Sequence, residues 1–217
     1  MSKKDEQEVV VQIPKIEIQQ LQVKIIGDAP LVVHKWSEKA KKEILDKQMK
    51  KASKGKEAKD PEMDFYHSMY WLNDIDEETA TKDDYAKLIK SGDARFGFPS
   101  VAFKACAVNA GYQQGILAKK TTARGAFHIQ SEFVEIFGKP YMREDMVRVG
   151  MGTADIRYRG EYRDWYAILN IAYNKNAISA DQIINLINMG GFANGVGEWR
   201  PEKDGQFGTF HVALDGE

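Results

Sequence analysis

Glycines, an indole and a guanidinium are concentrated near the carboxyl end of this chain. Residues 190–208 read GGFANGVGEWRPEKDGQFG. Glycine has no Cβ, so such a backbone can approach another surface closely, at an entropic cost when it becomes ordered. The indole of Trp199 and the guanidinium of Arg200 can stack on nucleobases, and a guanidinium also reaches phosphates. The segment predicts a binding surface made by Gly195, Gly197, Trp199, Arg200, Gly205 and Gly208.

Trp199 has a second interpretation that is equally well supported. Tryptophan is usually largely buried even near loops, so the indole could fold back as a lid on the core. Pro201 holds Arg200 in an extended conformation in either case, because the residue before a proline is restricted to extended backbone.

A basic segment earlier in the chain forms a second candidate site. It reads KKTTARG over residues 119–125 and is expected to be a loop. Lysine, arginine and threonine side chains all donate hydrogen bonds to phosphate oxygens. The candidates are Lys119, Lys120, Thr121, Thr122 and Arg124. The alternative is a solvated surface turn without a ligand.

A third candidate is an arginine-rich strand around residue 160. Alternation along a strand places every second residue on the same face, which here groups Arg157, Arg159 and Arg163. Cations in such a row can follow a phosphate backbone. They can equally pair across the sheet with acids such as Glu132 and Glu135, which is a routine stabilising pattern. Tyr158 and Tyr162, on the reverse face, are expected in the core.

Residue patterns that support catalysis are absent from the sequence. The histidines at positions 34, 67, 128 and 211 have no metal-ligand spacing, and no nucleophile-elbow or phosphate-loop motif occurs. Cys106 stands in an apolar helical pattern and is expected to be a buried structural thiol. The expectation is a protein without catalytic residues, metal or cofactor.

Composition favours a soluble protein with a substantial core. The chain has 217 residues, a formal net charge of −1 and a single cysteine, which excludes an intramolecular disulfide. No apolar run is long enough to span a membrane and no signal peptide precedes the first strand, so a cytoplasmic location is expected. The near-neutral charge gives no global basic field, so any nucleic-acid contact must be local.

Apolar periodicity predicts the order of the elements. Strands are expected over 9–26, 126–137, 156–173 and 207–214. Helices are expected over 100–112 and from 179 onward, the latter capped by Ser179. Residues 37–97, with a helix from 37 toward 51 and another over 81–89, are expected to be an insertion, and 138–152 a long connector. This order predicts an α+β, ferredoxin-like (split βαβ) fold, an antiparallel sheet with two helices on one face, plus helical and loop insertions.

With that topology, the glycine-rich turn resembles the glycine-rich loop of the RAMP superfamily, the ferredoxin-like RNA-binding subunits of CRISPR effector complexes. The matching residues are Gly190-Gly191, Gly195-Val196-Gly197 and Gly205-Gln206-Phe207-Gly208, after an Ile/Leu-rich helix. The resemblance implies a single RAMP-like domain over 1–217, with insertions at about 37–97 and 138–152 shaped like fingers or thumbs. The loop style is typical of stand-alone members of phage or prophage origin, which implies a host-cell cytoplasm.

The leading hypothesis is a non-enzymatic protein that coats single-stranded nucleic acid, with DNA favoured over RNA, as a homo-oligomer or filament through backbone phosphates. One alternative is a protein-interaction module that mimics or joins a CRISPR effector backbone. Another is a RAMP-like endoribonuclease that uses His128 or His211. No motif carries the preference for DNA, because the contacts to the 2′-hydroxyl that tell RNA from DNA have no sequence signature here.

Overall fold

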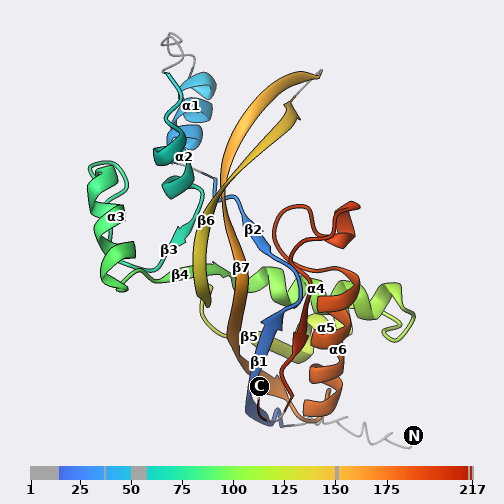
Figure 1. The fold of residues 1–217 in the computed structure, drawn as a ribbon. Coiled ribbons are helices and arrows are strands. Elements are labelled where there is room, and N and C mark those ends of the chain that lie inside the picture. Colours follow the sequence, from blue (N-terminus) through green and yellow to red (C-terminus); the bar gives the residue numbers. More distant parts are fainter. Residues whose placement is uncertain (1–14, 37, 50–57, 150–151, 215, 217) are drawn as a thin grey trace, which may run out of the picture.

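The strands of this computed structural model form one antiparallel sheet (Figure 1). The structure describes residues 15–36, 38–49, 58–149, 152–214 and 216. The eight-stranded sheet has the order β3-β4-β6-β7-β1-β8, and β2 and β5 pair with β7 beside this path. The strands are β1 (Ile18–Gly27), β2 (Leu31–Val33), β3 (Tyr70–Trp71), β4 (Phe96–Pro99), β5 (Phe127–Ile129), β6 (Phe133–Val149), β7 (Thr153–Asn174) and β8 (Phe210–Val212). The helices are α1 (Glu38–Gln48), α2 (Pro61–His67), α3 (Lys82–Ser91), α4 (Ser100–Gln113), α5 (Lys120–Ala126) and α6 (Ala180–Ala193), with a short 3₁₀ helix at Pro201–Lys203.

Four of these strands and two helices form the predicted split βαβ arrangement. Helix α4 connects β1 to β6 through the insertion, and α6 connects β7 to β8. In space, β7 lies between β6 and β1, and β1 lies between β7 and β8. All these pairs are antiparallel. The expected α+β fold with a ferredoxin-like sheet is therefore confirmed.

Helices α4 and α6 pack closely against each other on one face of the sheet. A Cβ added at Gly190 of α6 would lie 2.9 Å from the backbone of Ala107 in α4. A Cβ added at Gly191 would lie 2.0 Å from the carbonyl oxygen of Phe210 in β8. The core beneath the helices includes Phe103, Ile183, Leu186, Val23, Ile25 and Leu169, all buried. Small residues on α6 thus allow the helix to contact α4 and β8 at backbone distance.

The segment expected to be a connector, 138–152, is largely strand. Strand β6 continues to Val149, which pairs with Thr153 of β7, and the ladder is interrupted only by a register shift between Gly138 and Pro140. The two strands extend together beyond the rest of the sheet as a long hairpin (Figure 1). The connector prediction was wrong because Met142 and Met146, which are separated by charged residues as in a two-stranded ribbon, were not recognised as part of a strand pattern. We call the segment 140–160 the hairpin arm.

The insertion over 37–97 contributes a second aromatic layer to the core. Tyr66 of α2 stacks on Tyr85 of α3 with ring centroids 5.0 Å apart, and Trp71 lies 4.9 Å from Phe96. The helix predicted over 81–89 is α3, and Thr81 begins it with the expected capping box. The expected cap of α1 at Ser37 and the lysine-rich residues 50–57 lie outside the described residues. The helices of this insertion lie on the opposite side of the molecule from α4, α5 and α6 (Figure 1).

Two other local predictions differ from the structure. The expected loop over 115–125 contains helix α5, in which Ala123 and Ala126 are buried. The strand expected over 126–137 is divided into β5 and β6, because Ser131 adopts a positive φ of 70° that breaks the strand. The part of the first predicted strand before residue 15 lies outside the described residues. No helix in the described part of the chain is long and apolar enough to cross a membrane.

Replacing Gly191 with alanine should destabilise the fold. The new methyl group would overlap the carbonyl oxygen of Phe210, and such overpacking costs about 1–3 kcal/mol in the free energy of unfolding. Gly125→Ala is the matched control, because a Cβ there meets nothing within 4 Å. The control should keep the free energy of unfolding or raise it by about 0.5–1 kcal/mol, since alanine is the better helix former. Urea denaturation of both variants checks this; equal stability would contradict the packing argument.

Candidate nucleic-acid interface

The glycine-rich segment 194–208 is a series of tight turns after α6. Gly195, Gly197 and Gly208 have φ values of 63°, 83° and 68°. These values lie in the left-handed region that residues with a Cβ rarely adopt. Trp199 and Asp204 also have positive φ, at 55° and 60°. The glycines are therefore needed for the path of the chain itself.

These glycines also let the segment contact its own protein closely. A Cβ at Gly208 would lie 1.8 Å from the carbonyl oxygen of Val196, and one at Gly205 would lie 1.7 Å from that of Trp199. A Cβ at Gly197 would lie 2.5 Å from the carbonyl oxygen of Val32 in β2. The close approach that the sequence predicted is thus made, at these positions, to the protein's own backbone.

Hydrogen bonds fix the segment against β2 and within itself. The Glu198 amide donates to the Val32 carbonyl at 2.8 Å, and the Gly208 amide donates to the Pro30 carbonyl at 2.8 Å. The Val196 amide donates to the Gly208 carbonyl at 2.9 Å, which closes the loop. Several amides that a phosphate could have used are therefore already occupied.

Trp199 and Arg200 have different environments. Trp199 is 43% exposed, so its indole is partly covered by the protein and partly open to solvent. The Arg200 guanidinium forms an ion pair with Glu202 at 2.9 Å and donates to the Gly197 carbonyl at 3.0 Å. Trp199 is thus available for stacking, whereas Arg200 is held by an internal network.

A pocket of about 190 Å³ lies between the glycine-rich segment, α4 and the end of β2. Its lining includes His34, Tyr70, Asn109, Glu198 and Arg200. Burial, together with the positive charges of Arg159 and Arg157, lowers the pKa of His34 to about 4. Arg157 donates toward Nε2 at 3.0 Å, which places the proton of the neutral ring on Nδ1. His34 was not singled out from the sequence, because its arginine neighbours come from a strand more than a hundred residues away.

The arginine row on β7 is neutralised by carboxylates. Arg159 is buried and pairs with Asp145 at 3.1 Å, while Arg163 pairs with Glu161 at 3.5 Å. Arg157 pairs with Asp155 at 3.5 Å. Cross-strand pairing is thus made by Arg159 alone, since Arg157 and Arg163 pair with acids of β7 itself. The acids also differ from those predicted, because Glu135 binds Arg95. The expectation that the tyrosines are core residues is confirmed for Tyr162, which is 1% exposed, while Tyr158 is only half-buried.

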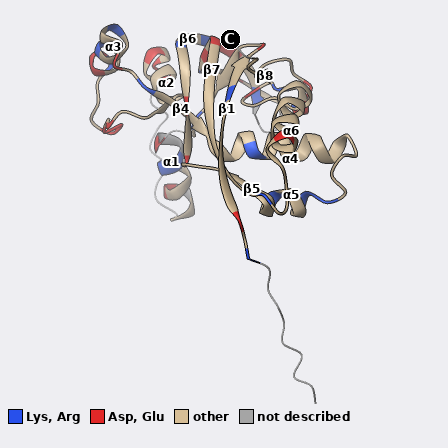
Figure 2. Ribbon diagram, turned by 90° about the horizontal axis from the view of Figure 1, so that it is seen from below, with Lys and Arg blue, Asp and Glu red and all other residues tan. Residues whose placement is uncertain are grey.

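Helix α5 and Lys119, which directly precedes it, carry three of the cations that the sequence proposed. In the described part of the chain, no carboxylate forms an ion pair with Lys119, Lys120 or Arg124. Lys120 lies over the Tyr112 ring at 5.0 Å, and Lys104 of α4 donates to the Arg124 carbonyl at 2.7 Å. Burial and the positive charge of Arg124 both lower the pKa of Lys104, as expected when no acid neutralises the cluster. Figure 2 shows these lysines and arginines in blue on α5 and the preceding segment.

We call Lys104, Lys119, Lys120 and Arg124 the α5 cation cluster. Thr121 and Thr122 are exposed beside it, as a phosphate-binding surface requires. Lys104 was missed by the sequence analysis, because it precedes the basic segment on a different helix. None of these four cations lines the pocket of the glycine-rich segment, so the two predicted sites do not share that pocket.

Groups suited to catalysis are not gathered together. Among the described residues, no group of three or more histidine, cysteine, aspartate or glutamate side chains could hold a metal ion. Burial raises the pKa of the Cys106 thiol to about 12, which keeps it protonated, and its expected buried position is confirmed. His128 Nδ1 lies 3.1 Å from Lys104 Nζ, and His211 Nδ1 lies 2.6 Å from Asp28 Oδ1. The absence of catalysis stays a prediction.

Comparisons with known proteins give a likeness of fold only. No protein-family model and no curated protein matches the chain. Among solved structures, the crystal structure of Cmr6 from Pyrococcus furiosus is similar, with 9% sequence identity and a TM-score of 0.44. The alignment covers 91% of this chain and 98% of that chain. The expected RAMP-like family and the expected phage origin both stay predictions.

Arg159 and Arg163 should differ sharply in their contribution to stability. The Arg159 side chain is 5% exposed, so Arg159→Gln leaves Asp145 without one of its two cations and should cost about 3–5 kcal/mol in the free energy of unfolding. Arg163 is 58% exposed, and Arg163→Gln should cost at most about 1 kcal/mol. Chemical denaturation of both proteins measures the difference. Equal losses would mean that the Arg159 pair has no structural role.

Proposed function

We propose that this protein binds single-stranded nucleic acid through phosphate contacts at the α5 cation cluster. The observation that carries the proposal is the contrast in charge pairing: Lys119, Lys120 and Arg124 have no carboxylate partner in the described structure, whereas the arginines of β7 and Arg200 are all paired. An unpaired cation gains a counter-charge on binding phosphate, while a paired one must first lose its acid.

The physical basis of this choice is the cost of rearrangement. Arg159 would have to leave Asp145 in a buried environment, and separating such a pair is expensive. Lys119 and Arg124 are exposed, so a phosphate can reach them without breaking an internal interaction. Phosphate contacts of this kind fix a strand without reading its sequence. We therefore expect little sequence preference.

The finer parts of the proposal concern the strand and the assembly. We propose DNA as the favoured strand and coating by a homo-oligomer or filament, as the sequence analysis expected. Coating predicts that the number of protein molecules bound rises with strand length and that binding is cooperative along the strand. Binding to strands of increasing length, followed by sedimentation, tests this part independently of the site.

Removing the α5 cations should weaken binding and its dependence on salt. The variant Lys119→Ala/Lys120→Ala/Arg124→Ala should bind labelled single-stranded DNA at least about tenfold more weakly at low salt, because three phosphate contacts are lost. The slope of log K against log salt should fall by about 2, since each contact to a single strand contributes about 0.7. Fluorescence anisotropy with single-stranded DNA, single-stranded RNA and duplex DNA at several salt concentrations measures both quantities.

The control removes the same charge elsewhere. Lys82→Ala/Lys87→Ala/Lys90→Ala changes three lysines of α3, on the other side of the molecule from α5 (Figure 1). This variant should bind like the unaltered protein. A wild-type affinity that does not change with salt, or an equal loss in both variants, would rule out phosphate binding at α5. Analysis of the recovered RNA for cleavage products tests the endoribonuclease alternative in the same samples.

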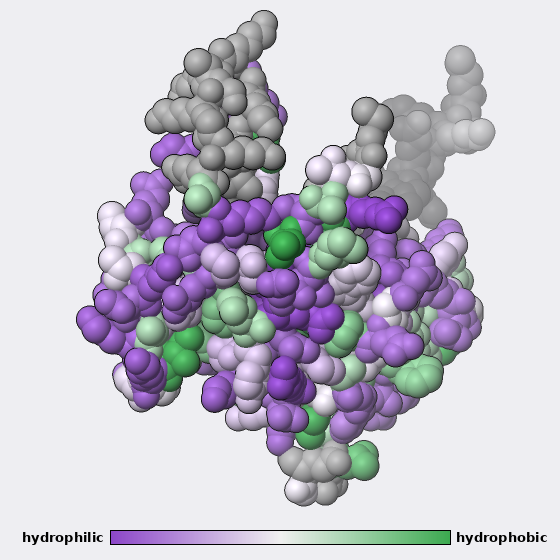
Figure 3. Space-filling model, turned by 45° about the horizontal axis from the view of Figure 1, so that its top comes forward, coloured by the Kyte–Doolittle hydropathy of each residue, from purple (hydrophilic) through white to green (hydrophobic). Residues whose placement is uncertain are grey.

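A protein-interaction module is the second candidate function, and the hairpin arm favours it. Met142, Met146 and Ile156 on the arm are 53%, 67% and 44% exposed, and Met146 pairs with Ile156 across the two strands. Elsewhere the surface is mostly hydrophilic with small scattered hydrophobic areas in the view of Figure 3. Exposed methionine on a projecting ribbon suits contact with another protein. Absence of nucleic-acid binding in the experiment above would favour this alternative.

A further inference from the structure

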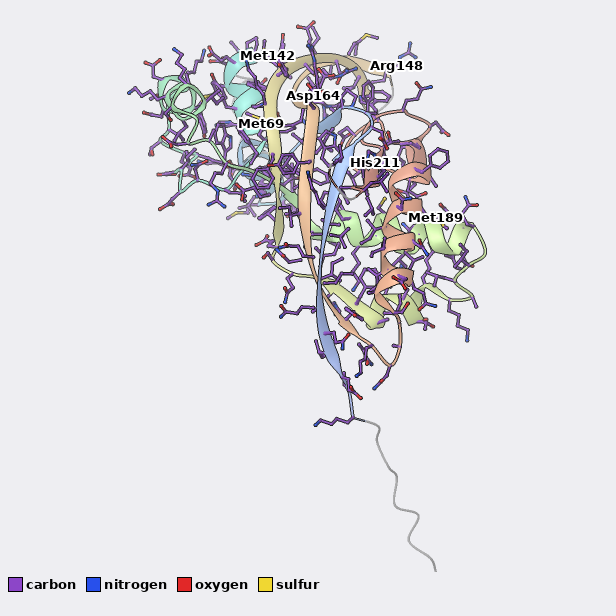
Figure 4. All side chains as sticks on the ribbon, turned by 60° about the horizontal axis from the view of Figure 1, so that its bottom comes forward. Met69, Met142, Arg148, Asp164, Met189 and His211 are labelled. Atoms are coloured by element: carbon purple, nitrogen blue, oxygen red, sulfur yellow. The ribbon has the colours of Figure 1, made fainter. Side chains whose placement is uncertain are left out.

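An apolar pocket lies directly beside the α5 cation cluster. Its volume is about 280 Å³, and it is bounded by α5, by one side of α6 and by the turn that follows α4. Met189, labelled in Figure 4, contributes from α6. The apolar lining includes Ile116, Leu117, Ala126, Ile178, Leu186 and Met189. Pockets of mostly apolar character with a few placed polar groups are typical of ligand sites.

Polar side chains in the pocket are few, and one of them is held in place. Gln182 accepts the Ser179 amide through Oε1 at 3.0 Å, which fixes the orientation of its side chain. Within the described structure the NH₂ group of Gln182 donates no hydrogen bond, so it stays available to a ligand. Asn185 and Thr122 also line the pocket. The site thus combines apolar walls with amide and hydroxyl groups that can meet the edge of a flat polar ring.

The cations lie next to the same walls. Thr122, Ala123 and Ala126 of α5 line the pocket, while Lys119, Lys120 and Arg124 stand on the same short segment. A ligand that occupies both features must have a flat, largely apolar body with hydrogen-bonding edges and an anionic group close to it. One nucleotide unit of a nucleic acid has this combination.

We infer that this pocket takes one nucleobase of a bound single strand while the adjoining phosphates contact the α5 cation cluster. The inference rests on the proposed function, which gives a binding site only for the phosphates of the strand; the inference adds a binding site for a base. A base in a duplex must first be unpaired and unstacked, whereas a base in a single strand is already accessible. The pocket therefore supplies a reason for single-strand selectivity that phosphate contacts alone do not give, because duplexes also carry phosphates.

Abasic DNA separates base binding from phosphate binding. A short single-stranded DNA and its abasic counterpart, with the same number of phosphates, are compared by fluorescence anisotropy. The unaltered protein should bind the base-containing strand about tenfold more tightly, the effect expected from one buried base. A strand carrying 2-aminopurine should change its fluorescence when the base enters the pocket.

Two substitutions test the pocket without touching a cation. Ala177 is exposed at the edge of the pocket, and Ala177→Phe should fill its opening. This variant should bind the base-containing strand and the abasic strand with about equal affinity, and its affinity for the abasic strand should match that of the unaltered protein. Ile116 is 60% exposed, and Ile116→Ala should reduce the preference a few-fold without unfolding the protein. Ala118→Phe is the matched control, because Ala118 is exposed beside Lys119 and does not line the pocket.

Each outcome distinguishes this inference from the proposed function. If the unaltered protein binds the base-containing strand and the abasic strand with equal, salt-sensitive affinity, base insertion is overturned and phosphate binding stays intact. An equal effect of Ala177→Phe and Ala118→Phe would also overturn it. If a nucleoside monophosphate displaces the labelled strand as effectively as the unlabelled strand does, the pocket is a site for free nucleotides, and the inference is overturned. Absence of binding to either strand would overturn the inference together with the proposed function.

Discussion

Backbone-distance packing of α6 against α4 and β8 is the constraint on which the rest of the structure depends. Gly190 allows α6 to meet α4, and Gly191 allows it to meet the carbonyl of Phe210. Because α6 is held so closely, the chain that leaves its end can reach β2 only through tight turns with positive φ. The same placement leaves one side of α6 facing α5, where the apolar pocket lies.

Charge pairing divides the cations of this protein into two kinds. Arg159 stabilises the base of the hairpin arm through Asp145, and the arm also contacts the glycine-rich segment, since Arg143 lies 4.6 Å from the Phe207 ring. These arginines connect parts of the fold that are distant in sequence. Lys119, Lys120 and Arg124 pair with no carboxylate in the described structure, although Lys120 contacts the Tyr112 ring of α4, so no ion pair of the fold uses their charge. A nearly neutral protein can thus keep one local region available for an anion.

The fold could be predicted from the sequence because its signals are local. The apolar pattern of α4, the Thr81 capping box of α3 and the Ser179 cap of α6 each act within a few residues. The β6 side of the hairpin arm was not predicted, since it is stabilised by pairing with β7 on a solvated ribbon, whereas residues 156–160 of the arm fall in the predicted strand 156–173. Pairing partners such as Arg159 and Asp145 are set by strand register, which a single sequence does not specify.

Binding sites are harder to predict from local sequence patterns than the fold, as the glycine-rich segment and the basic segment show. Glycine at 197, 205 and 208 indicates close approach of a backbone, but the sequence does not say to what, and here the partner is the protein's own chain. The basic segment indicated a group of cations without their surroundings, because Lys104 and Gln182 come from other helices. A group of cations is visible as composition, whereas the apolar pocket exists only where α5 and α6 meet. Its residues, such as Ile178 and Met189, are indistinguishable in sequence from ordinary core positions.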